Sequence, residues 1–238
     1  MSIQNFKRTI KKFLGDSYLP PRVVAGLPGE KILVLAPHPD DEVLGCGGSL
    51  LKLVSGQAAT IVFLTNGARG DPLGKHSDIV RVREEEARAA WSAVPGIKLE
   101  FLGLPDGKLL AHESEAVEKI SALGSFDTIL APSFSDRHPD HRAAAKIAVN
   151  LAGCWRAKIL FYEVWSTLPV NLIVDISGTI ENKRKLINSY QSQLGYQDLI
   201  HPMFGLNAYR TMDSGDEKIH YAEGFLALSH KEAEDFVV

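Results

Sequence analysis

Residues 31–42 read KILVLAPHPDDE, and the two halves of this stretch differ in character. The first six residues form a continuous apolar run, which is typical of a strand buried on both faces of a parallel sheet. The second half turns polar at Pro37 and contains one histidine and three acids. Ligands of open parallel sheets bind beyond the carboxyl ends of the strands, so we expect chemistry in this polar half.

Further apolar runs alternate with helical patterns along the chain. We expect strands at 31–36, 59–65, 98–102, 127–131 and 158–161, and helices from the first strand to about 55, at 79–94, 113–123 and 139–152. This alternation predicts an α/β fold, a Rossmann-like doubly wound and mostly parallel sheet with helices on both faces. Beyond residue 162 we expect a strand at 171–176, a helix at 179–191 and a loop-rich tail, which together form a short C-terminal extension of a single domain.

Length and composition limit the class of protein. We assign residues 1–29 of the 238 to an N-terminal amphipathic helix with an irregular lead-in, and 30–238 to one domain. The net charge of −3 argues against nucleic acid as a partner. No apolar run approaches the ~18 residues of a membrane span, no secretory signal pattern stands at the start, and two cysteines cannot form a disulfide framework. We therefore expect a cytoplasmic protein without a membrane span, for which a homo-oligomer is possible.

A second polar segment, DRHPDH at residues 136–141, follows the predicted fourth strand. In a doubly wound sheet the first and fourth strands are neighbours that flank the point where the strand order reverses. We therefore expect the two polar loops to face each other across one crevice, although Asp41 and His138 are 97 residues apart in the chain.

The residue types in these loops suit a catalytic metal. Imidazole and carboxylate are ordinary zinc ligands, and a catalytic site needs three protein ligands and an open position. His38, Asp41 and His141 can provide this set, and Asp40 can take a proton from a water that the metal acidifies. One His-Pro-Asp segment is more often a turn and a helix cap, but two at equivalent strand ends favour a site.

At these residues the sequence resembles the PIG-L/LmbE-like family of zinc-dependent N-acetylglucosaminyl deacetylases. The specific matches are HPDDE at 38–42 and HPDH at 138–141. Weaker matches are TNG at 65–67, REEEA at 83–87, FLGLPDG at 101–107, the segment from Lys183 to Ser192-Gln193, and YAEGF at 221–225. The resemblance covers about residues 31 to 226 and leaves the N-terminal helix outside.

The resemblance implies a hydrolase that removes an N-acetyl or similar small N-acyl group from an amino sugar or its conjugate. It implies Zn²⁺, or another divalent ion, on the three ligands named above, with Asp40 as general base. His138 would stabilise the oxyanion or protonate the leaving amine, and Asp140 would hold its imidazole. Some family members carry a tyrosine two residues before this histidine, where Asp136 stands here, so a tyrosine acid is excluded at that position.

The resemblance also places Arg83 and Asp106 against the sugar, and Arg69 and Asn66 are further candidates for substrate contact. From the residues themselves, Arg83 could equally pair with Glu86 on its helix, and an aspartate in Pro-Asp-Gly is a good turn residue.

Two other functions stay open at this point. One is hydrolysis of a phosphoester on the same metal centre, and the other is a non-catalytic module that binds a sugar or nucleotide. Gly45, Gly47 and Gly48 come too late after the first strand for a dinucleotide fingerprint, and they form no P-loop pattern.

Overall fold

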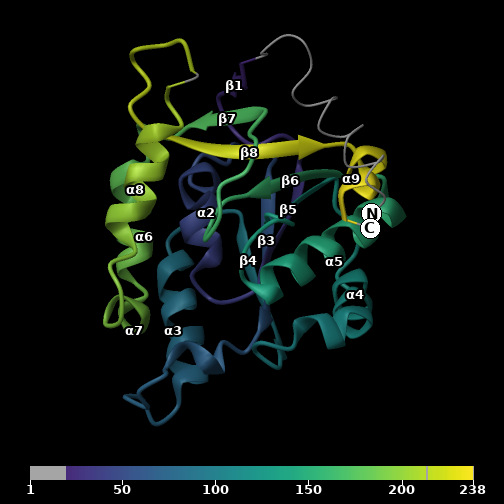
Figure 1. The fold of residues 1–238 in the computed structure, drawn as a ribbon, viewed down its shortest axis with the longest axis vertical. Helices are drawn as coiled ribbons and strands as arrows, with labels where there is room; N and C mark the ends of the chain where they lie inside the picture. Colours follow the sequence, from purple (N-terminus) through teal and green to yellow (C-terminus); the bar gives the residue numbers. More distant parts are fainter. Residues whose placement is uncertain (1–19, 213, 238) are drawn as a thin grey trace.

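The computed structural model describes residues 20–212 and 214–237 (Figure 1). The expected N-terminal amphipathic helix lies outside these residues. Among the helices of the described part, none combines the length and apolar character needed to cross a bilayer.

The strands of the described part form one eight-stranded sheet in the order β1-β7-β8-β6-β5-β2-β3-β4. Their bounds are β1 Arg22–Val24, β2 Lys31–Ala36, β3 Ala58–Thr65, β4 Ile97–Leu104, β5 Thr128–Pro132, β6 Lys158–Tyr162, β7 Leu172–Asp175 and β8 Ala222–Leu228. The central strand β2 pairs in parallel with β3 on one side and with β5 on the other. The strand order therefore reverses between β2 and β5, and the doubly wound α/β fold is confirmed.

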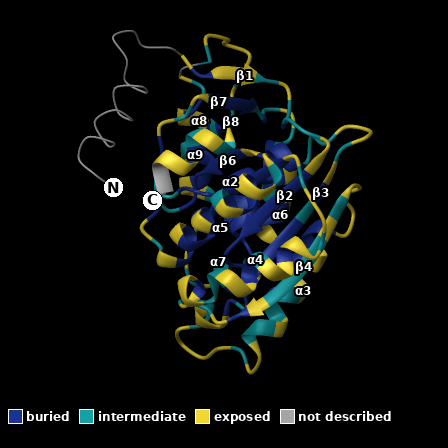
Figure 2. Ribbon diagram, turned by 90° about the vertical axis from the view of Figure 1, so that its right-hand side faces the viewer, coloured by how far each residue is buried: buried dark blue, intermediate teal, exposed yellow. Residues whose placement is uncertain are grey.

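Helices cover both faces of the sheet (Figures 1 and 2). Alternate residues of β2 show why: Ile32 and Val34 belong to one apolar core, and Leu33 and Leu35 belong to the other. The first core is closed by α2 Asp41–Leu50, α3 Ile79–Trp91, α6 Ile180–Asn188, α7 Gln191–Leu194 and α8 Ile200–Tyr209. The second is closed by η2 Leu109–His112, α4 Glu113–Ser121, α5 Pro139–Trp155 and α9 His230–Val237. A parallel strand with both faces buried is therefore apolar over nearly its whole length.

The C-terminal part is more regular than the sequence predicts. The tail expected to be rich in loops contains α8 and also β8, which lies antiparallel between β6 and β7 inside the sheet. Glu223 interrupts the apolar run of β8 and hides the strand from a pattern search. In the structure this carboxylate is buried, with Lys183 Nζ at 2.6 Å and the backbone N–H groups of Gly48 and Ser49 within 2.9 Å. The lead-in also contains the edge strand β1, which pairs with β7.

The glycines of α2 serve close packing. A Cβ on Gly45 would lie 2.1 Å from the ring of Tyr162, and one on Gly48 would lie 2.9 Å from Ile176. This helix therefore approaches β6 and the end of β7 more closely than any larger residue would permit.

Candidate active site

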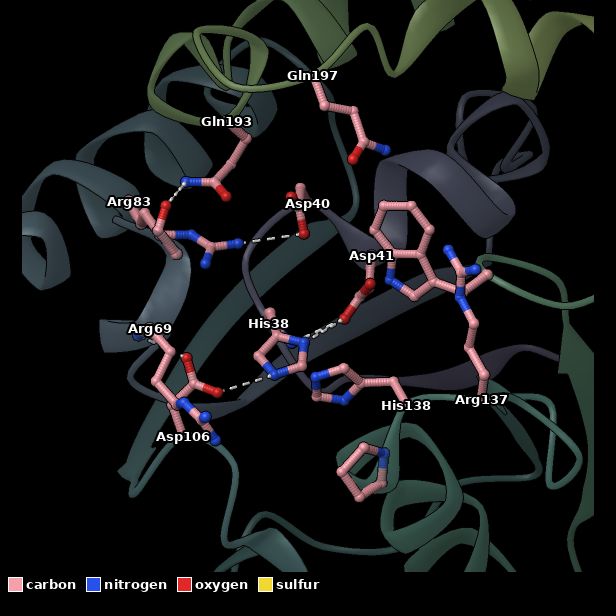
Figure 3. Close-up of a pocket in the computed structure, with 13 residues that line it drawn as sticks. His38, Asp40, Asp41, Arg69, Arg83, Asp106, Arg137, His138, Gln193 and Gln197 are labelled. Carbon is pink, nitrogen blue, oxygen red and sulfur yellow. Dashed lines mark hydrogen bonds and ion pairs between the residues drawn. The ribbon is translucent and has the colours of Figure 1, made fainter. Parts of the chain in front are cut away.

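A cleft of about 380 Å³ lies at the carboxyl end of the sheet (Figure 3). The loops that follow β2 and β5 face each other across it, because these strands are neighbours. The rings of His38 and His138 are 4.8 Å apart, and His141 Nε2 lies 3.2 Å from Asp41 Oδ2. The predicted meeting of the two loops is therefore confirmed.

Asp40 has an unusual backbone. Its φ of 129° is rare for any residue other than glycine and costs on the order of 1–3 kcal/mol. Several contacts hold it in place: its N–H donates to Glu42 Oε2 at 3.1 Å, and Arg83 Nη2 lies 3.2 Å from its Oδ1. Arg83 also donates to the carbonyl of Pro39. This strained conformation places the Asp40 carboxylate on the wall of the cleft (Figure 3).

Glu42 stabilises the turn at Asp40 from the interior of the protein. Its fully buried carboxylate accepts a hydrogen bond from Trp91 Nε1 at 3.0 Å and another from the Tyr190 hydroxyl. Burial raises the pKa of Glu42, and the hydrogen bonds from these two aromatic side chains oppose the rise. Because the residue does not line the cleft, it acts through the position of Asp40.

Burial also raises the pKa of Asp40, to about 7, and the positive charge of Arg83 opposes part of that rise. A carboxyl with a pKa near neutrality is a stronger base than an ordinary aspartate, and a useful fraction of it is still ionised at pH 7. Asp40 therefore has the chemistry expected of a general base.

Asp41 joins the two histidines expected to be metal ligands. Its Oδ2 lies 3.0 Å from His38 Nδ1 and 3.2 Å from His141 Nε2. Burial by itself would raise the pKa of Asp41, but the charge and hydrogen bond of His141, together with those of His38, hold the pKa well below its usual range. The structure thus brings the predicted ligand set together around an ionised carboxylate.

His141 supplies the test of whether a metal fits. The side chain is fully buried, yet neither ring nitrogen has a hydrogen-bond partner of acceptable geometry among the described residues. Nε2 faces Asp41, and Nδ1 lies 3.4 Å from Asp136 Oδ2. A cation between Nε2 and Asp41 would satisfy the first nitrogen, and a carboxylate behind the second is the usual partner of a metal-bound histidine.

The wider cluster also suits a cation. In the described part of the chain, His38, His138 and His141 have ligand atoms that all lie within 4.8 Å of one another, and so do His38, Asp106 and Asp140. The predicted set shares two members with the first group, and its third member, Asp41, contacts both of them. These imidazoles and carboxylates fit a divalent ion, zinc included.

Asp140 is not placed as expected. Its carboxylate accepts hydrogen bonds from the backbone N–H groups of Gly107 at 2.7 Å and Leu109 at 3.0 Å, and Oδ2 lies 3.3 Å from His38 Nε2. The expectation that this carboxylate holds the imidazole of His138 is therefore corrected. Asp140 lies in the first turn of α5, from which its side chain reaches the loop after β4, so it orients His38 instead.

The tautomer of His138 is set by its own helix. The residue is the N-cap of α5, and its Nδ1 accepts a hydrogen bond from the Asp140 backbone N–H at 3.2 Å. Because this nitrogen is an acceptor, the neutral ring carries its proton on Nε2. Burial, reinforced by the charges of His38 and His141, lowers the pKa of His138 and favours this neutral form. The ring is thus a hydrogen-bond donor on the wall of the cleft.

Three of the four residues predicted to contact the sugar line the cleft: Arg69, Arg83 and Asp106. Asp106 Oδ2 accepts the Arg69 N–H at 2.9 Å, and its Oδ1 lies 3.3 Å from His38 Nε2. The fourth, Asn66, is absent from the cleft wall, and its side chain accepts the N–H of Ala68 at 3.2 Å. The structure therefore places Asn66 in a turn and outside the cleft wall.

Of the two alternatives that the sequence leaves open for Arg83, the ion pair with Glu86 is not formed, and the contact with substrate stays a prediction. Glu86 instead accepts hydrogen bonds from the N–H and hydroxyl of Ser192, both at 2.7 Å. Arg83 is 3% exposed, and its guanidinium binds Asp40 and two backbone carbonyls, so it positions Asp40 as well as lining the cleft.

Trp165 and Gln197 line the cleft although no motif of the sequence indicates them. Trp165, on the loop after β6, lies beneath the guanidinium of Arg137, with 5.3 Å between this group and the ring centroid. Gln193 and Gln197 come from α7 and the loop that follows it. These loops lie beyond the regular strand–helix alternation, so no motif pointed to Trp165 or Gln197.

Comparison with known proteins gives three likenesses. The chain is 28% identical over 189 residues to the diacetylchitobiose deacetylase of Thermococcus kodakarensis. The matched region covers 69% of this chain and 70% of the Thermococcus protein. The N,N'-diacetylchitobiose deacetylase structure from Pyrococcus horikoshii superposes with a TM-score of 0.74 at 23% identity, covering 97% and 94% of the two chains. The 4-carboxy-2-hydroxymuconate hydratase of Pseudomonas putida KT2440 shares the fold with a TM-score of 0.65 at 20% identity, covering 84% and 96%.

A family model matches as well. The model described as PIG-L, GlcNAc-PI de-N-acetylase, matches residues 33–152, which is half of the chain and contains both polar loops. The resemblance inferred from the two motifs is therefore confirmed, and this chain belongs to the PIG-L family.

Proposed function

We propose that this protein is a metal-dependent hydrolase that removes an N-acetyl, or similar small N-acyl, group from an amino sugar or its conjugate. The observation that carries the proposal is the position of the Asp40 carboxyl on the wall of the cleft, beside a cluster of imidazoles and carboxylates that fits a cation. The diacetylchitobiose deacetylase of Thermococcus kodakarensis, related over most of its length, supports the choice of bond and substrate class.

In this proposal His38, Asp41 and His141 hold the metal, for which zinc is the first candidate. When bound, a divalent cation supplies Lewis acidity at the acyl carbonyl and acidifies a nearby water. Asp136 lies behind His141, and Asp140 lies behind His38, so a carboxylate holds each ring on the side away from Asp41.

The protein's own groups then move the protons. Asp40 accepts a proton from the attacking water, whose oxygen bonds to the acyl carbon. His138 donates a hydrogen bond from Nε2 to the negative charge that develops on the carbonyl oxygen, and the proton held by Asp40 passes to the leaving nitrogen. The C–N bond breaks, and the products are a carboxylate and a free amine that has gained a proton.

Recognition of the sugar falls to the side of the cleft that carries Arg69, Arg83 and Asp106. Guanidinium and carboxylate groups match the donors and acceptors of sugar hydroxyls. Neither alternative function has comparable support, because the glycines of α2 pack against side chains and form no phosphate cradle. The hydratase of similar fold shows that architecture by itself does not decide the reaction.

The test is an assay for free amine on a panel of N-acetylated amino sugars and conjugates, with and without added zinc. Wild type should release amine in a metal-dependent way. Asp40→Asn should lose about 10²- to 10⁴-fold in turnover while it retains metal. The matched control is Asp235→Asn, an exposed position on α9. Full turnover by Asp40→Asn would show that the base is misassigned, and metal-independent release of amine would refute the proposed mechanism.

A further inference from the structure

A second cavity, of about 320 Å³, adjoins the cleft. The walls of both cavities include Arg137, Trp165 and Gln197, so the two lie side by side. We call this second cavity the annex. Its remaining walls are apolar: Leu44, Val164, Leu199, Pro202 and Met203.

Four of these apolar side chains, all but Pro202, are themselves buried in the fold, with exposed fractions between 2% and 8%. They come from separate parts of the chain: Leu44 from α2, Val164 from the loop after β6, and Met203 from α8. Because these buried side chains come from separate elements and all line one cavity, the annex is an internal feature of the fold and not a groove between surface side chains. Apolar hollows of this size beside a reaction centre are typical of ligand sites.

The position of the annex identifies which part of a substrate it faces. Arg69 and Asp106 lie on one side of the His38–Asp41 pair, and Arg137, which lines the annex as well as the cleft, lies on the other (Figure 3). The cleft is therefore polar on one side of the reacting centre and borders an apolar cavity on the opposite side. In an N-acyl amino sugar, the sugar and the acyl chain likewise extend in opposite directions from the scissile amide.

We propose that the annex binds an apolar N-acyl chain longer than acetyl, so that amino sugars carrying fatty N-acyl groups are substrates. This inference rests on the proposed function and extends it. The bond chemistry is unchanged: the water oxygen bonds to the acyl carbon, the C–N bond breaks, the nitrogen takes a proton, and the chain leaves as a fatty carboxylate.

The expected gain follows from burial of methylene groups. Each methylene buried in an apolar cavity increases binding by about fourfold. If the chain enters the annex before the rate-limiting step, kcat/KM should rise with chain length until the annex is full and then level off or fall.

The experiment compares N-acetyl-, N-butanoyl-, N-hexanoyl- and N-octanoylglucosamine with the full-length, metal-loaded protein, scored by free amine. We expect kcat/KM for the hexanoyl substrate to exceed that for the acetyl substrate by about tenfold or more. Met203→Trp, which fills the annex, should abolish this gain and leave the acetyl substrate within about twofold of wild type. Ala208→Trp adds bulk to the same helix, in the groove lined by Phe204 and Tyr221, and should keep the gain.

A further variant covers the case in which Met203→Trp does not fold. Leu199→Ala enlarges the annex and should move the preferred acyl chain to a greater length. The octyl glycoside of N-acetylglucosamine serves as a separate arm, because it carries its apolar chain on the anomeric oxygen.

The outcomes separate this inference from the proposed function. A flat dependence on acyl length, with the acetyl substrate still cleaved, would overturn the acyl assignment and leave the proposed function intact. The acyl assignment would also be overturned if kcat/KM rose for the octyl glycoside but not for longer acyl chains, and if Met203→Trp removed that rise. Failure to cleave any N-acyl sugar would overturn both.

Discussion

Replacing Arg83 by glutamine tests whether the charge of this guanidinium sets the pKa of Asp40, the proposed base. The buried guanidinium lies 3.2 Å from Asp40 Oδ1. An opposite charge at such a distance lowers a carboxyl pKa by about 1–3 units. Its removal should therefore raise the pKa of Asp40 by a similar amount above its present value of about 7.

The size of the effect on activity follows from the ionised fraction. Asp40 acts as a base only when deprotonated, so activity falls as the pH drops through its pKa. Half of the carboxyl is ionised where the pH equals its pKa, and on the acid side of that point the ionised fraction falls about tenfold for each further pH unit. A rise of about 1–3 units should therefore lower kcat/KM on the acid limb about 10-fold to 1000-fold. The loss should be recovered at higher pH.

The assay is kcat/KM for release of free amine, measured from about pH 5 to about pH 10 for wild type and variant. A bound cation lowers the Asp40 pKa in both proteins, so the quantity compared is the displacement between the two acid limbs. Arg83→Lys keeps the charge and should displace the limb less. Arg81→Gln is the matched control, because Arg81 lies on the same helix with its side chain 71% exposed.

The reasoning is refuted if Arg83→Gln binds metal and unfolds as wild type does, yet keeps its acid limb at the wild-type pH. An acid limb that moves to lower pH would contradict the sign of the argument. An equal displacement in Arg81→Gln would point to a long-range charge effect instead of the contact with Asp40.

Three other substitutions probe separate parts of the account. Asp136→Asn weakens the carboxylate behind His141 and should lower zinc affinity about 10- to 100-fold, measured by competition with a chelating dye; an unchanged affinity would show that Asp136 is no metal support. Lys183→Met leaves Glu223 buried without its cation and should lower the free energy of unfolding in urea by about 3–5 kcal/mol. Adding Glu223→Gln should recover most of this loss, and a loss below about 1 kcal/mol would contradict the prediction. His138→Gln should lower kcat about 10²- to 10³-fold with metal retained, whereas loss of the metal would make His138 a ligand.

The parallel part of the sheet could be predicted from the sequence because its strands are buried on both faces. The apolar run of β2 has the bounds that the sequence indicates, and those of β3 to β6 shift by at most three residues at either end. Neighbouring strands then fix where loops meet, so the encounter of Asp41 with His141 also followed from the strand order.

The remaining features depend on tertiary contacts that no local pattern contains. The strand β8 includes Glu223, a residue type that is normally exposed. It is buried here because Lys183, 40 residues earlier in the chain, neutralises its charge. Asp140 follows His138 closely in sequence, but its carboxylate finds donors on Gly107 and Leu109 in another loop. Side-chain direction at the start of a helix is set by such partners, so sequence proximity gave the wrong neighbour.

A metal held by His38, Asp41 and His141 is the centre of the proposed hydrolysis of an N-acyl amino sugar. The most direct measurement is to strip the protein with a chelator and titrate it with zinc while following free amine from an acetylated amino sugar. We predict negligible turnover at the start and a linear recovery that ends at one zinc per chain, with no recovery in His141→Ala. Full turnover of the stripped protein, or full recovery by His141→Ala, would contradict the central claim.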